Sequence, residues 1–418
     1  SCFFPLIITN QYVINKKINF YNFNLLMTEI IIPKNITPSK LNKLFRGYLI
    51  EQKLDNVTLS IPHSINKYTF GLLADLLKFI ITLNNKSTIK TLKIVADNKD
   101  LETFYDQEYA YPIVSLLWNT SNFIDKDGYE IKTLLRKNQN DYFIKMNSLS
   151  RLKGNKYILT NTDHLPKNKG LIRLFENSEG FNDNEDQIAS SVKKILNNYV
   201  LTFNKNNLIE IDNIVNDIGA IVYELIKNTF EWGKTDSLNI DIPSSIRGVY
   251  FRFHKNDKEK IIQEFANTPL DTFFKEEYIT NECINKLNQI YFLEILVFDS
   301  GVGFIDKFHR KDSLTDLEII KKCLIKNQTS SVTNLKSKKG LGLDRILNIL
   351  NSKGFVRITT DKYSVYRDLI KDKYKPTNID NLDTLILEDW NKKDFEPNYG
   401  IKTSGSHINI LYPFKSGL

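Results

Sequence analysis

The feature that most constrains the fold is an apolar run that ends in an acid and a glycine turn. Tyr291 to Phe298 reads YFLEILVF, and Asp299 to Phe304 follows directly as DSGVGF. A short apolar run bounded by glycines is typical of a strand buried in a sheet. Gly301 and Gly303 lack a side chain, so the backbone there can approach a bound group closely. The sequence therefore predicts a strand end at which Asp299 and a tight turn lie together.

A long helix is predicted upstream, beginning near Ile211, and its second half from Ile221 to Asp236 reads IVYELIKNTFEWGKTD. At 3.6 residues per turn, one narrow stripe holds Glu224, Asn228 and Glu231, extended backwards by Asp217 and Ala220. A separate, wide apolar face holds Ile214, Ile218, Ile221, Val222, Leu225 and Thr229. A carboxylate and an amide one turn apart can accept a proton from water and ligate a hard cation such as Mg²⁺. Taken alone, the stretch also fits a plain surface helix.

A third stretch, Gly340 to Leu343, reads GLGL and is expected to open a helix over Asp344–Ser352, with Gly354 as its cap. The chain thus carries E-x-x-x-N, D-x-G-x-G and G-x-G-L in that order, on a helix, a strand end and a helix start. One glycine motif is common by chance, whereas three in order at suitable spacing are not.

In these three stretches the chain resembles the GHKL ATPases, a superfamily that includes DNA gyrase B subunits, heat-shock chaperones, MutL proteins and histidine kinases. The stretches match the N, G1 and G2 boxes of that superfamily, and the match covers roughly Gln187 to Leu418. The resemblance implies a Bergerat fold, a two-layer α/β sandwich with a mixed sheet. It also implies an ATP pocket on one face of that sheet, covered by a mobile lid.

The resemblance assigns the adenine side of the pocket to the G1 box. Asp299 would accept the adenine N6 amino group, and Gly301 and Gly303 would let the backbone approach the base and ribose. Ser406 matches the hydroxyl residue of the superfamily's last strand. It would support the Asp299 side of the pocket through water.

The phosphate side is assigned to the N and G2 boxes. Asn228 would ligate Mg²⁺, and the GLGL residues Gly340, Leu341, Gly342 and Leu343 would cradle phosphate at a helix N-terminus. Lys338 and Lys339 either pair with phosphate or remain solvated in the lid. Thr329, Ser330 and Ser331 belong to the same expected lid.

Glu224 is the expected general base, because hydrolytic members and anti-sigma-type serine kinases carry a Glu at this place. It would orient and deprotonate water or an acceptor hydroxyl, and could reach Mg²⁺ through water. Glu231, on the same stripe, would tune the Mg²⁺ shell.

Two features depart from named branches of the superfamily. No histidine lies in a helix that could serve as the phosphoacceptor hairpin of a sensor kinase; the five are His63, His164, His254, His309 and His407. Little of the sequence follows the expected final strand, so we expect no counterpart of the lysine that a second domain donates in gyrase and MutL-type enzymes. Slow hydrolysis, or hydrolysis completed by a partner, is therefore expected.

The N-terminal half has a strand–helix–strand pattern. Strands are predicted at Val57–Ile61 and Ile89–Ala96, and helices at Lys67–Leu83, Tyr111–Trp118 and Tyr129–Arg136. The outline is similar to STAS-like regulatory domains, which work by protein contacts, and equally to a generic α/β module. Residues before Met27 are expected to be a poorly packed extension or an upstream reading of the frame, with a strand and then a helix capped by Ser39 following.

The expected division is an extension over 1–26, an N-terminal α/β domain over 27–165, a linker over 166–186 and the ATPase-like domain over 187–418. The polar stretch Asn155–Asp186 suggests the boundary. In the second domain, helices are predicted at Gln187–Phe203 and Thr315–Cys323, with an insertion at Lys255–Lys286. Further strands are predicted at Arg247–His254, Phe355–Thr360 and Gly405–Pro413, and Asp361–Tyr399 reads as a long charged segment.

Composition bears on the partners and the cellular compartment that we expect. The net charge is +8, but the acids are interspersed with the bases, so a nucleic-acid partner is not expected. The three cysteines have no metal-binding spacing, which suits a reducing cytoplasm. No apolar run is long enough for a membrane span.

Three functions follow from this combination. The first is a Mg²⁺-dependent ATPase whose nucleotide state gates contacts with a protein partner or a second copy, in a bacterial regulatory or defence system. The second is a serine/threonine kinase of the anti-sigma type. The third is a non-catalytic, nucleotide-gated interaction module.

Overall fold

A computed structural model of the chain describes residues 28–50, 54–202, 208–308, 314–325, 342–377, 379–392 and 402–416. The expected extension over 1–26 and the expected lid, including Lys338 and Lys339, lie outside these residues, as do His309, Gly340 and Leu341.

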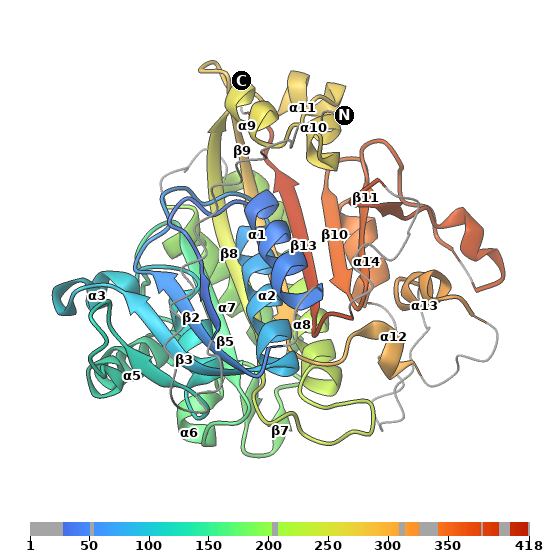
Figure 1. The fold of residues 1–418 in the computed structure, drawn as a ribbon. Coiled ribbons are helices and arrows are strands. Elements are labelled where there is room, and N and C mark those ends of the chain that lie inside the picture. Colours follow the sequence, from blue (N-terminus) through green and yellow to red (C-terminus); the bar gives the residue numbers. More distant parts are fainter. Residues whose placement is uncertain are drawn as a thin grey trace, which may run out of the picture.

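Two sheets of different kinds organise the molecule (Figure 1). The smaller sheet is parallel, with the order β1-β2-β3-β4. Its strands are β1 (Thr28–Ile31), β2 (Asn56–Pro62), β3 (Thr88–Val95) and β4 (Asn122–Ile124). Helices in its connections bring successive strands back in the same direction, as parallel pairing requires.

Among the described residues, the larger sheet has seven strands in the order β12-β11-β10-β13-β9-β8-β5, and every neighbouring pair in it is antiparallel. The strands are β5 (Lys156–Thr162), β8 (Ile246–Asp257), β9 (Gln289–Asp299), β10 (Phe355–Thr360), β11 (Tyr363–Asp368), β12 (Glu388–Asp389) and β13 (Ser406–Pro413). The expectation of a mixed sheet is therefore wrong for the described strands. Direct returns, such as the tight turn from β10 to β11, produce antiparallel neighbours.

The N-terminal helices are α1 (Pro38–Phe45), α2 (Leu72–Lys86), α3 (Leu101–Phe104), α4 (Ala110–Leu117), α5 (Lys132–Asn147) and α6 (Lys167–Gly170). A small hairpin, β6 (Glu176–Asn177) and β7 (Gly180–Phe181), leads into the second half. There the helices are α7 (Glu185–Ile195), α8 (Leu208–Trp232), α9 (Lys258–Glu264), α10 (Pro269–Phe273), α11 (Glu277–Glu282), α12 (Phe304–Lys307), α13 (Asp316–Cys323) and α14 (Gly342–Ile349). Wider helical turns continue α1 and α7 over Arg46–Ile50 and Leu196–Val200.

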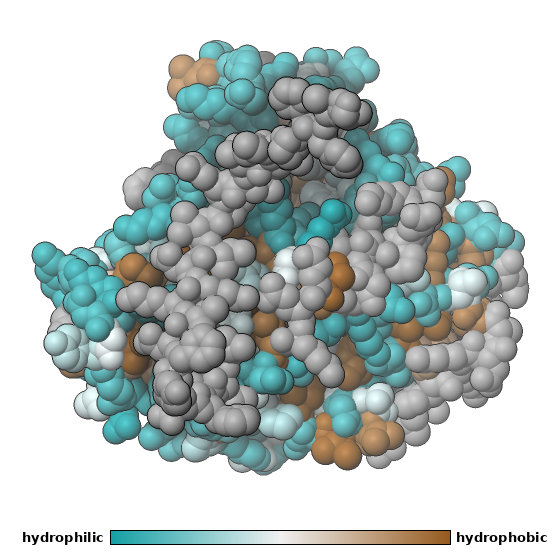
Figure 2. All heavy atoms as spheres, in the orientation of Figure 1, coloured by the Kyte–Doolittle hydropathy of each residue, from teal (hydrophilic) through white to brown (hydrophobic). Residues whose placement is uncertain are grey.

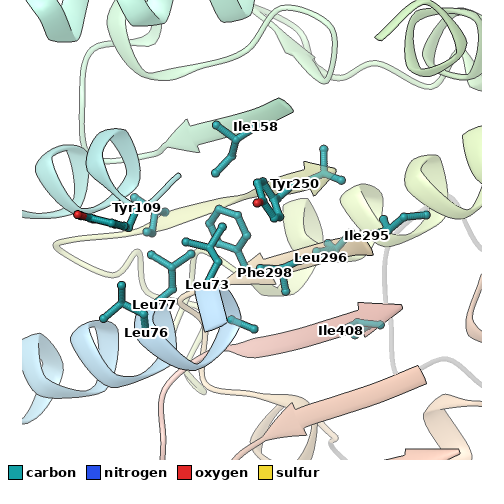
Figure 3. Packing of buried hydrophobic residues seen from close by; sticks show 14 of the residues in the cluster. Leu73, Leu76, Leu77, Tyr109, Ile158, Tyr250, Ile295, Leu296, Phe298 and Ile408 are labelled. Atoms are coloured by element: carbon teal, nitrogen blue, oxygen red, sulfur yellow. The ribbon is translucent and has the colours of Figure 1, made fainter. Parts of the chain in front are cut away.

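Helices cover both faces of the large sheet. α8 packs against β8 and β9 with α7 and α14 beside it, whereas α2 and α4 pack on the opposite face (Figure 1). Side chains alternate between the faces along each strand, so Phe298 points to the α2 face and Asp299 to the α8 face. Figure 3 shows Leu73 and Leu77 of α2 packed near Phe298 and Tyr250 of the sheet.

One continuous hydrophobic core joins the two sheets, because buried residues of α2, α4 and the parallel sheet contact the large sheet. Polar contacts reinforce this junction. Arg357 of β10 pairs with Asp75 of α2 at 3.0 Å, and Nδ1 of His407 lies 2.8 Å from the Ala74 carbonyl oxygen. The N-terminal half is therefore packed directly on the large sheet.

The insertion that carries α9, α10 and α11 has a second, smaller core, which includes Phe265, Phe273 and Ile279 together with Phe70. Its outer surface is largely hydrophilic at the top of the view in Figure 2. Among the described residues, no helix combines the length and the apolar character needed to cross a bilayer.

Several elements differ from expectation. The N-cap of α1 is Thr37 rather than Ser39, because Thr37 has the extended backbone and its hydroxyl accepts from the Lys40 N–H at 3.3 Å. The helix expected at Tyr129–Arg136 is the longer α5, whose mostly polar sequence hides its period. The expected N-terminal domain over 27–165 includes β5, yet β5 pairs with β8 of the large sheet. β11 lies within Asp361–Tyr399, for which no strand was predicted, and is paired between β10 and β12.

Candidate functional site

Asp299 lies at the end of β9 with 7% of its surface exposed. Its Oδ1 accepts two backbone hydrogen bonds, from the Gly301 N–H at 2.9 Å and from the Ser406 N–H at 3.1 Å. Within the part of the chain that the structure describes, Oδ2 has no hydrogen-bond partner. The carboxylate is thus fixed through one oxygen, and the other can accept from a ligand.

Glycines allow this close packing around Asp299. A Cβ on Gly233, directly after α8, would lie 2.6 Å from the Asp299 Cβ, and one on Gly301 would lie 2.6 Å from the Trp232 carbonyl oxygen. Gly405 has a φ of +82°, and a Cβ there would lie 2.0 Å from the Asp299 carbonyl oxygen. The glycines therefore let the end of β9, the end of α8 and the start of β13 meet.

The two predicted G1 glycines serve packing within the protein. Gly303 has a φ of +89°, and a Cβ there would lie 2.7 Å from the Thr360 hydroxyl. That hydroxyl accepts from the Phe304 N–H at 3.0 Å and lies 3.2 Å from the Ser406 hydroxyl. Ser406 therefore supports Asp299 directly through its backbone, and its hydroxyl holds the turn after Gly303 through Thr360.

Burial raises the pKa of Asp299 to about 6. The two backbone N–H donors and the positive charge of Arg247 counteract the effect of burial, and the negative charge of Asp163 adds to it. At neutral pH most of the molecules therefore carry an ionised Asp299, although the charge is costly to hold there.

Arg247 of β8 is the register partner of Asp299, and Asn161 of β5 is the register partner of Arg247. Arg247 is 1% exposed and pairs with Asp163 at 2.7 Å and with Glu176. These residues were not among the sequence candidates. The alternation of Arg247, Val249 and Phe251 along β8 was a usable signal, since it places the arginine on a buried face.

α8 carries Glu224 and Asn228 on the side predicted for them. Glu224 is 8% exposed and Asn228 is half-buried, whereas Ile221 and Leu225 on the predicted apolar face are 1% exposed. The side chain of Ile214 lies outside the described part. At 1.5 Å rise per residue, Asn228 lies about 7 Å and Glu224 about 13 Å along the axis from Gly233, where α8 meets Asp299. The helix thus leads from Asp299 past an amide to a carboxylate.

The pKa of Glu224 is raised, chiefly by burial. The charges of Glu185 and Glu231 raise it further, while those of Lys227 and Arg345 lower it. A carboxylate with a raised pKa in a partly closed place has the character of a proton acceptor.

The groups around Glu224 also escaped the sequence reading. Lys227 is 2% exposed, and its Nζ lies 3.4 Å from Oδ1 of Asp183 and donates to the Tyr223 hydroxyl at 3.2 Å. Arg345 of α14 pairs with Glu185 of α7 at 3.0 Å. Three helices therefore bring charge to Glu224.

The described part of the predicted phosphate cradle is the start of α14. Gly342 opens the helix, and α14 packs beside α8. The Leu343 side chain is 7% exposed and belongs to the main core, so it anchors the helix start.

The four described histidines lie apart and have contacts of their own. His254 is buried against Glu294 at 2.7 Å, and His164 lies between the carbonyl oxygens of Ser115 and Ser245. Among the described residues, no cluster of three or more His, Cys, Asp or Glu side chains is placed to hold a metal ion.

The fold and the site together define a mixed α/β protein. It has a buried carboxylate, held through one of its two oxygens, at the junction of an antiparallel sheet and a long helix. No protein-family model matches the chain. No curated protein and no solved structure matches it either.

Proposed function

We propose that the chain is a Mg²⁺-dependent ATP-binding protein and ATPase of the GHKL type. The strands β8, β9, β13, β10 and β11 with α7, α8 and α14 would form a variant of the Bergerat-fold domain, with an antiparallel instead of a mixed sheet among the described strands. Nucleotide state would gate contacts with a protein partner or a second copy, in a bacterial regulatory or defence system. The N-terminal parallel sheet with its helices would be a STAS-like contact module.

The observation that carries the proposal is the state of Asp299. Its Oδ1 is saturated by two backbone donors, and Oδ2 is left as an acceptor beside the end of α8. The exocyclic amino group of adenine is a donor, whereas guanine presents a carbonyl oxygen at the same place. An acceptor fixed in this way therefore favours ATP over GTP.

The residues on α8 fit a nucleotide that extends from Asp299 along the helix. Asn228 offers an uncharged oxygen ligand, and Glu224 lies one turn further on. Mg²⁺, when bound, would neutralise the phosphate charge. Asn228 would hold the ion, and the bare backbone at Gly342 together with Arg345 would contribute positive potential near Glu224.

Glu224 would act as the general base. Burial raises its pKa, which favours proton acceptance, while the positive charges of Lys227 and Arg345 act in the opposite direction. The acceptor of the γ-phosphate would be water in an ATPase and a protein hydroxyl in a kinase.

The packing of α2 on the sheet supports the gating part of the proposal. Asp75, Ala74 and Gly71 of the N-terminal half contact Arg357, His407 and Glu294 of the large sheet. A shift of β9 or β13 on nucleotide binding would thus move α2 through these direct contacts.

The experiment that tests the proposal is calorimetric titration with ATP and GTP, with and without Mg²⁺, followed by product analysis. We expect ATP to bind, GTP to bind far more weakly, and ADP to form much more slowly when Glu224 is replaced. Phosphoserine or phosphothreonine on a protein substrate would indicate the kinase, and tight ATP binding with no product would indicate a nucleotide-gated interaction module. Absence of ATP binding would refute the proposal.

A further inference from the structure

A buried ion cluster lies beside the proposed adenine site. Nε and Nη2 of Arg247 donate to the Asp163 carboxylate at 3.0 Å and 2.7 Å, and Nη2 also donates to Glu176. Glu176 accepts a further hydrogen bond from Asn161 at 2.7 Å. Two acids thus share one arginine.

The cluster is on the same side of the sheet as Asp299. Arg247 and Asp299 are register partners on β8 and β9, so their side chains leave the same face as neighbours. The end of α8 covers both, because the Arg247 guanidinium lies 5.6 Å from the Phe230 ring and Gly233 contacts the Asp299 side chain. Asp163 is held there too, since its Oδ2 accepts from the Ser245 hydroxyl at 2.8 Å.

Only two of the three guanidinium nitrogens of Arg247, Nε and Nη2, donate hydrogen bonds to described residues. Nη1 is buried, and none of the described residues offers it a hydrogen-bond partner. Buried polar groups are almost always paired, so an exception at this position calls for a reason other than packing. The neighbouring Asp299 carboxylate, which carries a charge in a nearly closed site, gives such a reason.

Further titratable groups lie on described elements near Asp299. The end of α8 brings Glu231, and the segment after it brings Lys234, whose Nζ lies 4.0 Å from the centre of the Phe230 ring. β13 brings His407, on the other face of the sheet, whose pKa burial lowers to about 4, so it is neutral at pH 6. Glu176 lies behind Arg247. Arg247 and Asp163 are therefore the opposed charges most directly placed to act on Asp299.

We infer that Arg247 and Asp163 are positioning residues that set the charge of Asp299, and thereby the pH range in which the protein binds adenine nucleotides. The inference deepens the proposed function and rests on it for its ligand. Arg247 holds Asp299 ionised, and Asp163 limits that effect. The site is thus poised so that nucleotide binding weakens on mild acidification.

The test measures the affinity for Mg²⁺·ATP between pH 5 and pH 8 in the full chain and three variants. Asp163→Asn removes the opposing acid, so we expect the acidic midpoint of binding to move down. Arg247→Gln removes the favourable charge, so the midpoint should move up. A shift of about one pH unit corresponds to a tenfold change in affinity on the acidic side. Arg247→Lys keeps the charge and should leave the midpoint unchanged.

A direct measurement of the ionisation of Asp299 makes the test independent of nucleotide binding. The carboxyl carbon of Asp299, in protein labelled with ¹³C-aspartate and assigned against Asp299→Asn, should titrate near pH 6 in the parent chain and lower in Asp163→Asn. The measurement on Asp163→Asn tests the inference even if Arg247→Gln fails to fold.

The possible outcomes distinguish failure of this inference from failure of the proposed ATP-binding function. Opposite midpoint shifts in Asp163→Asn and Arg247→Gln, or the downward carbon titration, support the inference. Weaker binding at every pH with an unmoved midpoint, or an unmoved carbon titration, overturns it and leaves the cluster a structural role. If the parent chain binds no ATP, the proposed function fails, while the carbon titration still decides whether Asp163 acts on Asp299.

Discussion

Ser406 and Asp299 are joined by a hydrogen bond of 3.1 Å from the Ser406 backbone N–H to Oδ1 of Asp299. The bond links the first residue of β13 to the last residue of β9. Because the Gly301 N–H occupies the same oxygen, the bond fixes which oxygen of Asp299 is left for a ligand.

Asp299→Asn should abolish ATP binding and leave the fold intact. The amide oxygen can keep both backbone donors, so its NH₂ group would face the adenine amino group, donor against donor. Removing a buried charge should also raise the free energy of unfolding of the nucleotide-free protein by about 1–3 kcal/mol at pH 7. Thermal denaturation with and without ATP measures both effects; ATP stabilisation equal to that of the parent would contradict the adenine assignment.

The pH should affect stability and binding in opposite directions. The pKa of Asp299 is about 6 in the folded chain and 3.8 for an ordinary aspartate, so its ionisation costs stability above pH 6. That cost is relieved as the pH falls from about 6 towards 4. Protonation goes to the unoccupied Oδ2 and replaces the acceptor with a donor, so ATP affinity should fall over the same range. Titrations in saturating Mg²⁺, which keeps the phosphates ionised, test this; constant affinity from pH 8 to pH 5 would be contrary evidence.

Asn228→Ala should remove the Mg²⁺-dependent part of ATP binding. Loss of one oxygen ligand worth about 1.4 kcal/mol lowers the affinity roughly tenfold with Mg²⁺ and leaves the affinity without Mg²⁺ unchanged. Asn228→Asp retains an oxygen ligand and serves as the control. Equal losses with and without Mg²⁺ would show that Asn228 does not act through the metal.

Glu224→Gln should spare nucleotide binding and reduce turnover by roughly 10²–10⁴-fold, as expected for loss of a general base. Asp217→Asn is the matched control on the same stripe of α8, two turns before Glu224, and should retain turnover within a few fold. Single-turnover formation of ADP measures the chemical step. Parent-like ADP formation in Glu224→Gln would remove Glu224 from the mechanism.

Gly405→Ala should disrupt the junction that holds Asp299. The residue has a φ of +82°, and the new methyl carbon would lie 2.0 Å from the Asp299 carbonyl oxygen. The matched control is Gly128→Ala, which has a φ of +95° and open space around the position, so it carries only the cost of the backbone conformation, about 1 kcal/mol. Urea unfolding should show a clearly larger loss for Gly405→Ala; equal losses would mean that the junction adapts.

Much of the local structure followed from the sequence. The buried strand before Asp299, the helix that carries Glu224 and Asn228 and the helix opened by Gly342 have strong periods and clear end signals, and all three are present. The helix expected at Thr315–Cys323 is also present as α13, with Thr315 as its N-cap. Elements with weak periods were missed or shortened, such as α5 and the hairpin before α7.

The sequence by itself determined that Asp299 ends a strand beside a glycine turn and that Glu224 and Asn228 share one side of a helix, because these follow from chain-local periodicity. Only the tertiary structure decided that Arg247, Asp163 and Ser406 meet at Asp299. They come from three separate strands or loops, and the order in which distant strands pair is set by long-range packing. The tertiary structure also decided that Asp299 keeps only one oxygen for a ligand. That depends on which backbone groups of β13 and the turn arrive beside it, and long-range packing sets their positions.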